Sequence, residues 1–219
     1  PIVYRSLVNE TEVYFERQWL TGFSTRIGLH QSQWKPFDNY NYEVLDEQGI
    51  SQTKSSFTNS GFEFSMRYAY SERNLSAKYG DGLEGFYFPK YPVISLNYMQ
   101  GINGFMNGEF NMTRLRLRVE EKLRTKKLGY SLFRIETGKT WGVLPFPLLE
   151  TPTANQIIIN DETAFHLMNY LEFVSDKFVS ARWEQHFEGL LFNRIPLIKT
   201  LTWREIIFAN CYSVPLSAE

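Results

Sequence analysis

The sequence has 219 residues, of which 43% are apolar, and its 23 basic side chains almost balance its 24 acidic ones. A chain with this balance has no overall basic field, so we expect no nucleic-acid partner. Its longest uninterrupted apolar runs, such as 189–192, fall far short of the roughly 18 residues that a membrane-spanning helix requires. Cys211 is the only cysteine, which excludes an internal disulfide and a zinc site built from several thiolates.

Long alternating segments begin at residues 18–33, where side chains of one parity are mostly apolar and the others are polar or small. The apolar set includes Trp19, Phe23, Ile27 and Leu29. A two-residue period is typical of a β-strand, because successive side chains of a strand point to opposite faces. Residues 34–56 then carry several turn-forming side chains, and we predict a long loop there.

The clearest strand covers residues 58–70. Its apolar face consists of Ser60, Phe62, Phe64, Met66, Tyr68 and Tyr70. About thirteen residues extend about 40 Å, enough to cross a hydrocarbon layer about 30 Å thick at a tilt of about 45°. Strands of soluble sheets usually have about five or six residues. We therefore predict a transmembrane β-barrel.

Five more strands are expected after a Gly- and Tyr-rich link at residues 72–91. They cover residues 92–99, 114–120, 132–137, 178–188 and 202–213, and in the last one Arg204 and Glu205 would lie on opposite faces. Gly101 and Gly104 mark one turn, and residues 124–129 form another. Gly138 is interpreted as a strand end, and the following excursion to residue 177 would include a short helix at 162–173.

In a barrel, one face of each strand contacts lipid and the other points into the lumen. The expected lipid-facing side chains are Phe62, Phe64, Met66, Tyr68, Leu115, Leu117, Phe133, Ile135 and Trp183. The expected lumen charge cluster is Arg114, Arg116, Arg118, Glu120, Arg134, Glu136, Arg182 and Glu184. Opposite charges on neighbouring strands can pair. We favour a salt-bridged plug that stiffens a narrow barrel; the alternative is an electropositive lumen that selects anionic solutes.

Short periplasmic turns and longer extracellular loops alternate around such barrels. The rule predicts that turn 124–129 and link 189–201 are periplasmic and that residues 138–177 are extracellular. The expected periplasmic turn within this link is Asn193, Arg194, Ile195 and Pro196. Its apolar residues leave two interpretations open: docking to a periplasmic partner, or a link that tucks under the barrel mouth. The proline-rich segment 143–152 folds as an inward cap or packs on the rim.

Three ordered segments carry a family resemblance. They read ETGKTWGVLPFPLLE at 136–150, AFHLMNYLEFVSDKFV at 164–179 and GLLFNRIPLIK at 189–199, the last running into Trp203-Arg204-Glu205. Together they resemble an uncharacterised family of Gram-negative outer-membrane β-barrels whose full-length members carry an N-terminal carboxypeptidase-regulatory-like domain. This family is similar to the barrel superfamily of surface antigens and outer-membrane assembly factors. The resemblance covers about residues 58–212 and implies a location in the outer membrane, with no agreed activity.

The sequence also departs from this family pattern. It begins at Pro1 without the N-terminal domain, and residues 215–219 lack an aromatic-terminated last strand. Seven predicted strands are fewer than the even number of at least eight in bacterial single-chain barrels. We therefore expect residues 1–219 to form one incomplete barrel domain, whose partners are outer-membrane lipids and a periplasmic or membrane protein.

Candidate chemistry is sparse. The triplet at 138–140 lacks the earlier glycine of a phosphate-binding loop, because Phe133 occupies that position. Ser180 and His186 are six residues apart on an extended strand, about 20 Å, so they cannot form a catalytic pair. The histidines, His30, His166 and His186, lack the spacing of a metal site. We predict no catalytic residue, cofactor or metal, and no enzymatic role.

The expected fold is therefore all-β: an antiparallel meander of long strands that forms all or part of a transmembrane β-barrel. The expected function is a cell-envelope role, either as a scaffold or related to transport. One alternative is a channel for small or anionic solutes. Another is a soluble carbohydrate-binding β-sandwich, for which the 16% aromatic content is also suitable. The sandwich requires a second sheet over Phe62, Phe64, Met66 and Phe133.

Overall fold

The computed structural model describes residues 6–19, 22–37, 41–45, 51–70, 91–126, 128–152, 174–190, 192–201 and 203–214. Eight of its strands form one sheet, in which each strand pairs with the next in antiparallel orientation. These strands are β1 (Ser6–Gln18), β2 (Phe23–Pro36), β5 (Phe57–Ala69), β6 (Val93–Gly101), β7 (Met112–Thr125), β8 (Gly129–Trp141), β9 (Lys177–His186) and β10 (Ile206–Ser213). The predicted all-β antiparallel meander is confirmed.

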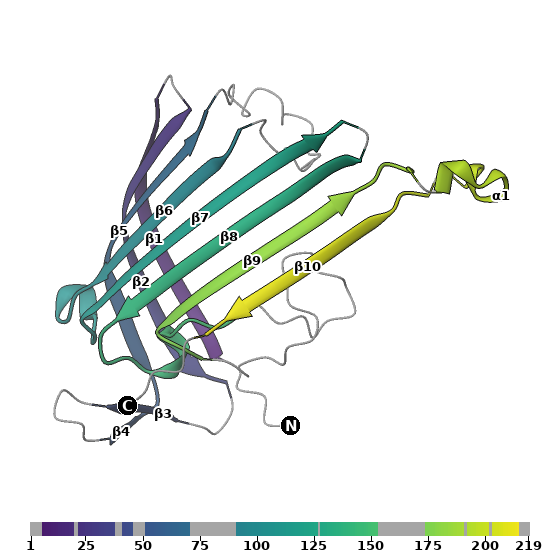
Figure 1. Ribbon diagram of the computed structural model, residues 1–219. Coiled ribbons are helices and arrows are strands. Elements are labelled where there is room, and N and C mark those ends of the chain that lie inside the picture. The colour runs from purple at the N-terminus through teal and green to yellow at the C-terminus, as the bar shows by residue number, and fades with distance from the viewer. Residues whose placement is uncertain are drawn as a thin grey trace.

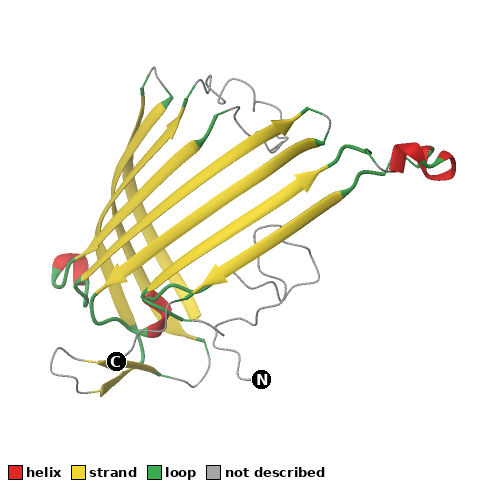
Figure 2. Ribbon diagram, viewed as in Figure 1, coloured by secondary structure: helices red, strands yellow, loops and turns green. Residues whose placement is uncertain are grey.

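The sheet curves like the wall of a barrel and stays open between β1 and β10 (Figure 1). A separate hairpin of β3 (Tyr42–Leu45) and β4 (Ser51–Lys54) lies at the end of the sheet where β2 stops and β5 begins. Strands account for most of the ribbon, as Figure 2 shows. None of the helices in the described residues is long and apolar enough to cross a membrane.

Several predicted boundaries are wrong. The prediction missed β1, whose glutamate-rich sequence hides its alternation, and it began the next strand at Gln18, which ends β1. The predicted loop 34–56 contains the β3–β4 hairpin. Gly138 lies inside β8, because its missing side chain makes room for the ring of Phe178 on β9. The last strand begins at Ile206, so Arg204 and Glu205 precede it. The predicted helix at 162–173 lies outside the described residues.

The connections at the two ends of the sheet differ. The turn around residues 126–128 and the link 187–205 leave one end, and the excursion 142–176 leaves the other. Link 70–92 is also long and leaves the first end, so connection length alone does not separate a short-turn end from a long-loop end. The assignment of these ends to periplasm and exterior stays a prediction.

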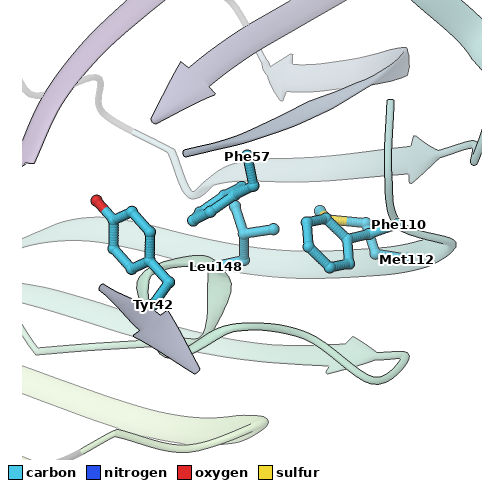
Figure 3. Packing of buried hydrophobic residues seen from close by; sticks show 5 residues of the cluster. All are labelled: Tyr42, Phe57, Phe110, Met112 and Leu148. Carbon is cyan, nitrogen blue, oxygen red and sulfur yellow. The ribbon is translucent and has the colours of Figure 1, made fainter. Parts of the chain in front are cut away.

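The buried hydrophobic cluster lies at one end of the sheet, on the face toward which the sheet curves. It consists of Tyr42, Phe57, Phe110, Met112 and Leu148 (Figure 3). The rings of Tyr42 and Phe57 meet edge to face with centroids 4.9 Å apart, and Phe57 meets Phe110 in the same way at 5.5 Å. Leu148 belongs to the short helix η3 (Phe146–Leu148), so the proline-rich segment is an inward cap.

Candidate functional site

The outer face of the curved sheet is built from rows of apolar side chains. One row crosses five strands through Phe15, Ile27, Phe64, Tyr98 and Leu115, which are direct neighbours in register. Phe15 is 71% exposed and Ile27 is 59% exposed. A sheet in water normally covers such a face, because apolar surface is favourable only when removed from water.

All nine side chains predicted to face lipid lie on this outer face. Phe62, Tyr68, Leu115, Leu117, Phe133, Ile135 and Trp183 are exposed, and Phe64 and Met66 are half-buried. The sandwich alternative required Phe62, Phe64, Met66 and Phe133 to be buried beneath a second sheet, and none of the four is. The short helix η2 (Phe105–Asn107) contacts this face at one end, where Phe105 stacks on Phe62 with centroids 5.1 Å apart.

The inner face carries ion pairs in register across β7 and β8. Arg118 lies opposite Glu136, with 3.0 Å between Nη2 and Oε2. Glu120 lies opposite Arg134, with 2.5 Å between Oε1 and Nε. The predicted pairing of opposite charges across this hairpin is confirmed. Both pairs are partly exposed, so each stabilises the fold by only about 1 kcal/mol or less.

Glu150 is the acid that sequence reasoning missed. It is 2% exposed and pairs with two arginines of β7, at 3.1 Å from Arg114 Nε and 2.5 Å from Arg116 Nη2. Thr140 donates a hydrogen bond from Oγ1 to Glu150 Oε1 over 3.0 Å. Arg114 also donates to the backbone carbonyl of Leu148. The segment 142–150 is therefore fixed to the inner face by charge as well as by the apolar cluster.

The only sequence signal for Glu150 is its place at the end of the motif at 136–150. The sequence around Glu150 does not alternate between apolar and polar residues, so periodicity could not assign its side chain to a face of the sheet. The contact with β7 depends on how residues 142–149 fold back, which spacing alone does not specify.

Arg182 and Glu184 share the inner face but stand apart from the pairs of β7 and β8. Arg182 donates from Nε to Asn210 Oδ1 over 3.1 Å, and Glu184 contacts His186 Nε2 at 3.2 Å. Arg182 lies opposite Arg134 in register. The structure thus brings the eight predicted cluster residues to one face, divided into small groups.

The first strands add acidic groups to the same face. Arg26 on β2 lies 3.0 Å from Glu16 and 3.9 Å from Glu12, both on β1, and its guanidinium stands 4.1 Å above the Tyr14 ring. The inner face therefore carries both signs of charge. An electropositive surface would need cations without such partners, so the paired arrangement does not favour anion selection.

The predicted turn from Asn193 to Pro196 is built by η4 (Phe192–Arg194) and α1 (Pro196–Lys199). All four of its residues are exposed, which contradicts the interpretation that the link tucks under the mouth. Figure 1 shows α1 projecting away from the sheet. Glu205 fixes the base of the link, because its carboxylate accepts hydrogen bonds from the backbone N–H groups of Gly189, over 2.8 Å, and Phe192.

Groups that could serve chemistry are dispersed. Among the described residues, no set of three His, Cys, Asp or Glu side chains is placed to hold a metal ion. His186 stacks on Tyr130 with centroids 4.4 Å apart, and Lys122 Nζ lies 3.8 Å from the centroid of the same ring. These contacts make a packed cluster at the end of β7, β8 and β9.

A comparison with known families matches residues 8–219 to the C-terminal domain of a family of unknown function, DUF5686. The chain belongs to this family. The match includes all of β2 to β10 and nearly all of β1, so the sheet with its apolar outer face and charged inner face belongs to the DUF5686 C-terminal domain. A search among curated proteins found no match. The expected membership of an uncharacterised family is confirmed.

Proposed function

We propose that this DUF5686 C-terminal domain forms part of the wall of a β-barrel in the outer membrane of a Gram-negative bacterium. Its role is in the cell envelope, as a scaffold or in transport. The observation that carries the proposal is the inverted sheet, with exposed apolar rows outside and paired charges inside. Hydrocarbon tails are the medium in which such an outer face has no cost.

The dimensions of the outer face fit this medium. Its positions run along β5 from Ser60 to Tyr70, the residue after the strand, about 33 Å along the chain at about 3.3 Å per residue. A tilt of about 40° reduces this to about 25 Å, the height of the apolar band of outer-membrane barrels. Polar residues border the band in this row, since Gln31 lies opposite Ser60 and Thr11 lies opposite Gln31.

A structural role fits the inner face better than a wide pore. The buried cluster and the segment that ends at Glu150 occupy one end of the inner face. The ion pairs tie neighbouring strands together. The exposed link around α1 is the part of the described chain best placed to dock to a periplasmic or membrane protein. The family's description as a C-terminal domain is consistent with an additional N-terminal domain in longer members.

Tryptophan quenching tests this proposal. Trp183 lies on the outer face and is 37% exposed, whereas Trp34 lies on the inner face and stacks on Phe57 with centroids 5.9 Å apart. Two variants would each retain one of these tryptophans and carry Phe at the other four. In vesicles with brominated acyl chains, Trp183 fluorescence is expected to fall strongly and Trp34 fluorescence little. Equal quenching, or no association with vesicles, would refute a lipid-facing outer surface.

A further inference from the structure

Two lysines face each other on the outer surface of β8 and β9. Lys139 and Lys177 are direct neighbours in register. The adjacent pair is hydrogen-bonded, because Thr140 N–H donates to the carbonyl of Asp176 over 2.6 Å. Pair types alternate along an antiparallel ladder, so the lysines form a non-hydrogen-bonded pair, in which side chains lie closest. Like charges in this arrangement destabilise a sheet.

No carboxylate of the described chain offsets this repulsion. The ion pairs there leave out both lysines. Lys139 Nζ lies 5.0 Å from the centroid of the Trp141 ring, which is 43% exposed. In contrast, Arg114 and Arg116, two neighbouring cations of the inner face, share the buried Glu150. Among the described residues, the fold therefore supplies an anion to Arg114 and Arg116 and none to Lys139 and Lys177.

The lysines also lie where the apolar band ends. Next along the same strands on the same face are Thr137 and Val179, and then Ile135 and Ala181. Val179 is 47% exposed and Ile135 is 51% exposed. On the other side of Lys139 is Trp141, a side chain that favours the boundary between hydrocarbon and water. Along β8, the order on the outer face is therefore an indole ring, a cation and then an apolar surface.

We propose that Lys139, Lys177 and Trp141 bind the phosphate of an anionic membrane lipid, whose acyl chains lie along Ile135 and Val179. The inference rests on the proposed function, since it requires the outer face to contact a bilayer. Each ammonium offers three hydrogen-bond donors to phosphate oxygens. One phosphate between them replaces repulsion with two attractions, and the indole ring fixes the depth of the headgroup.

Lipid retention by the full chain tests this site. The chain would be refolded into phosphatidylcholine vesicles with increasing phosphatidylglycerol, extracted gently, and analysed by native mass spectrometry for bound lipid. At about fivefold in affinity per lysine, the double variant Lys139→Gln/Lys177→Gln is expected to bind phosphatidylglycerol about 25-fold more weakly. Lys35→Gln is the matched control, because Lys35 is an exposed outer cation opposite Leu7, and it should bind like the unchanged chain.

Stability provides a second readout whose sign depends on the lipid. In vesicles of phosphatidylcholine alone, Lys177→Gln should unfold at the same or higher temperature than the unchanged chain, because it removes a repulsion. With phosphatidylglycerol present the order should reverse. Excess inorganic phosphate should not displace the lipid, since it has no acyl chains; full displacement would indicate a free-phosphate site and overturn the lipid assignment.

The failures are distinguishable. If all variants insert into vesicles but bind phosphatidylglycerol equally, the lysines only extend their charges into water and the lipid site is wrong, while the proposed barrel wall stands. If the chain does not insert at all, the barrel wall is wrong and the lipid site fails with it.

Discussion

Replacing Phe64 by Arg distinguishes an outer face in contact with hydrocarbon from one in contact with water. Phe64 lies in the central apolar row, between Ile27 on β2 and Tyr98 on β6. A guanidinium there would have to enter hydrocarbon, which costs about 2 to 4 kcal/mol near the midplane of a barrel wall. In water, the same position is a partly exposed sheet surface, where substitutions usually change stability by about 0.5 kcal/mol or less.

Urea unfolding in phosphatidylcholine vesicles measures the difference. Since about 1.4 kcal/mol is a factor of ten, the folding equilibrium constant should fall by a factor of about 30 to 900. The folded band of a heat-modifiability gel should weaken in parallel. Glu63→Gln is the matched control on the adjacent inner position, where the carboxylate accepts a hydrogen bond from Ser65 Oγ over 3.3 Å. An amide oxygen can accept the same bond, so this change should be mild.

The two variants must differ for the facing assignment to hold. If Phe64→Arg and Glu63→Gln unfold at the same urea concentration, the outer face does not contact hydrocarbon. If Phe64→Arg is more soluble than the unchanged chain and equally stable without lipid, the sheet is a water-exposed one and the proposed barrel wall is wrong.

Three further predictions follow from individual contacts. Glu150→Gln should lower the free energy of unfolding, measured in urea, by about 3 to 5 kcal/mol, because it leaves two arginines around a buried neutral group. Glu136→Gln, in a partly exposed pair, should lower it by about 1 kcal/mol or less. Similar values for the two variants would contradict the burial of Glu150. Gly129→Ala should lower the midpoint of thermal unfolding far more than Gly104→Ala. Both glycines have positive φ, but of the two only Gly129 would place a Cβ against a backbone oxygen, at 2.0 Å. Equal effects would refute that close approach. Cys211, which is exposed on the outer face of β10, should react in vesicles with an apolar maleimide and resist a charged one, and equal labelling would place it in water.

The sequence predicted the faces of the strands better than their ends. Alternation assigns each side chain of β5, β7 and β8 to the same parity as the structure does, because a strand interior has only two faces. Strand ends depend on turn geometry, and only four residues of sequence separate the end of β1 at Gln18 from the start of β2 at Phe23. In β1 the outer Val13 and Phe15 are outnumbered by polar neighbours, so the pattern was too weak to reveal an edge strand.

The site was partly predictable for the same reason. Glu120 and Arg134 come from alternating strands joined by a tight turn, so their pairing follows from register. Glu150 comes from an irregular segment, and its contact with Arg114 and Arg116 depends on a backbone fold that has no period. The lysine pair required both register and the direction of two strands separated by a long excursion, which the sequence alone could not align.

The distribution of buried side chains gives the strongest argument about the outer medium. A soluble chain would use its irregular segments to cover its most apolar sheet face. Here the covering residues, Tyr42, Phe110 and Leu148, pack on the inner face instead, where the strands carry arginine and glutamate. The outer rows around Ile27 and Ile135 stay exposed. In the described chain, apolar side chains therefore cover the charged face and leave the apolar face open, which supports the proposed contact between the outer face and hydrocarbon.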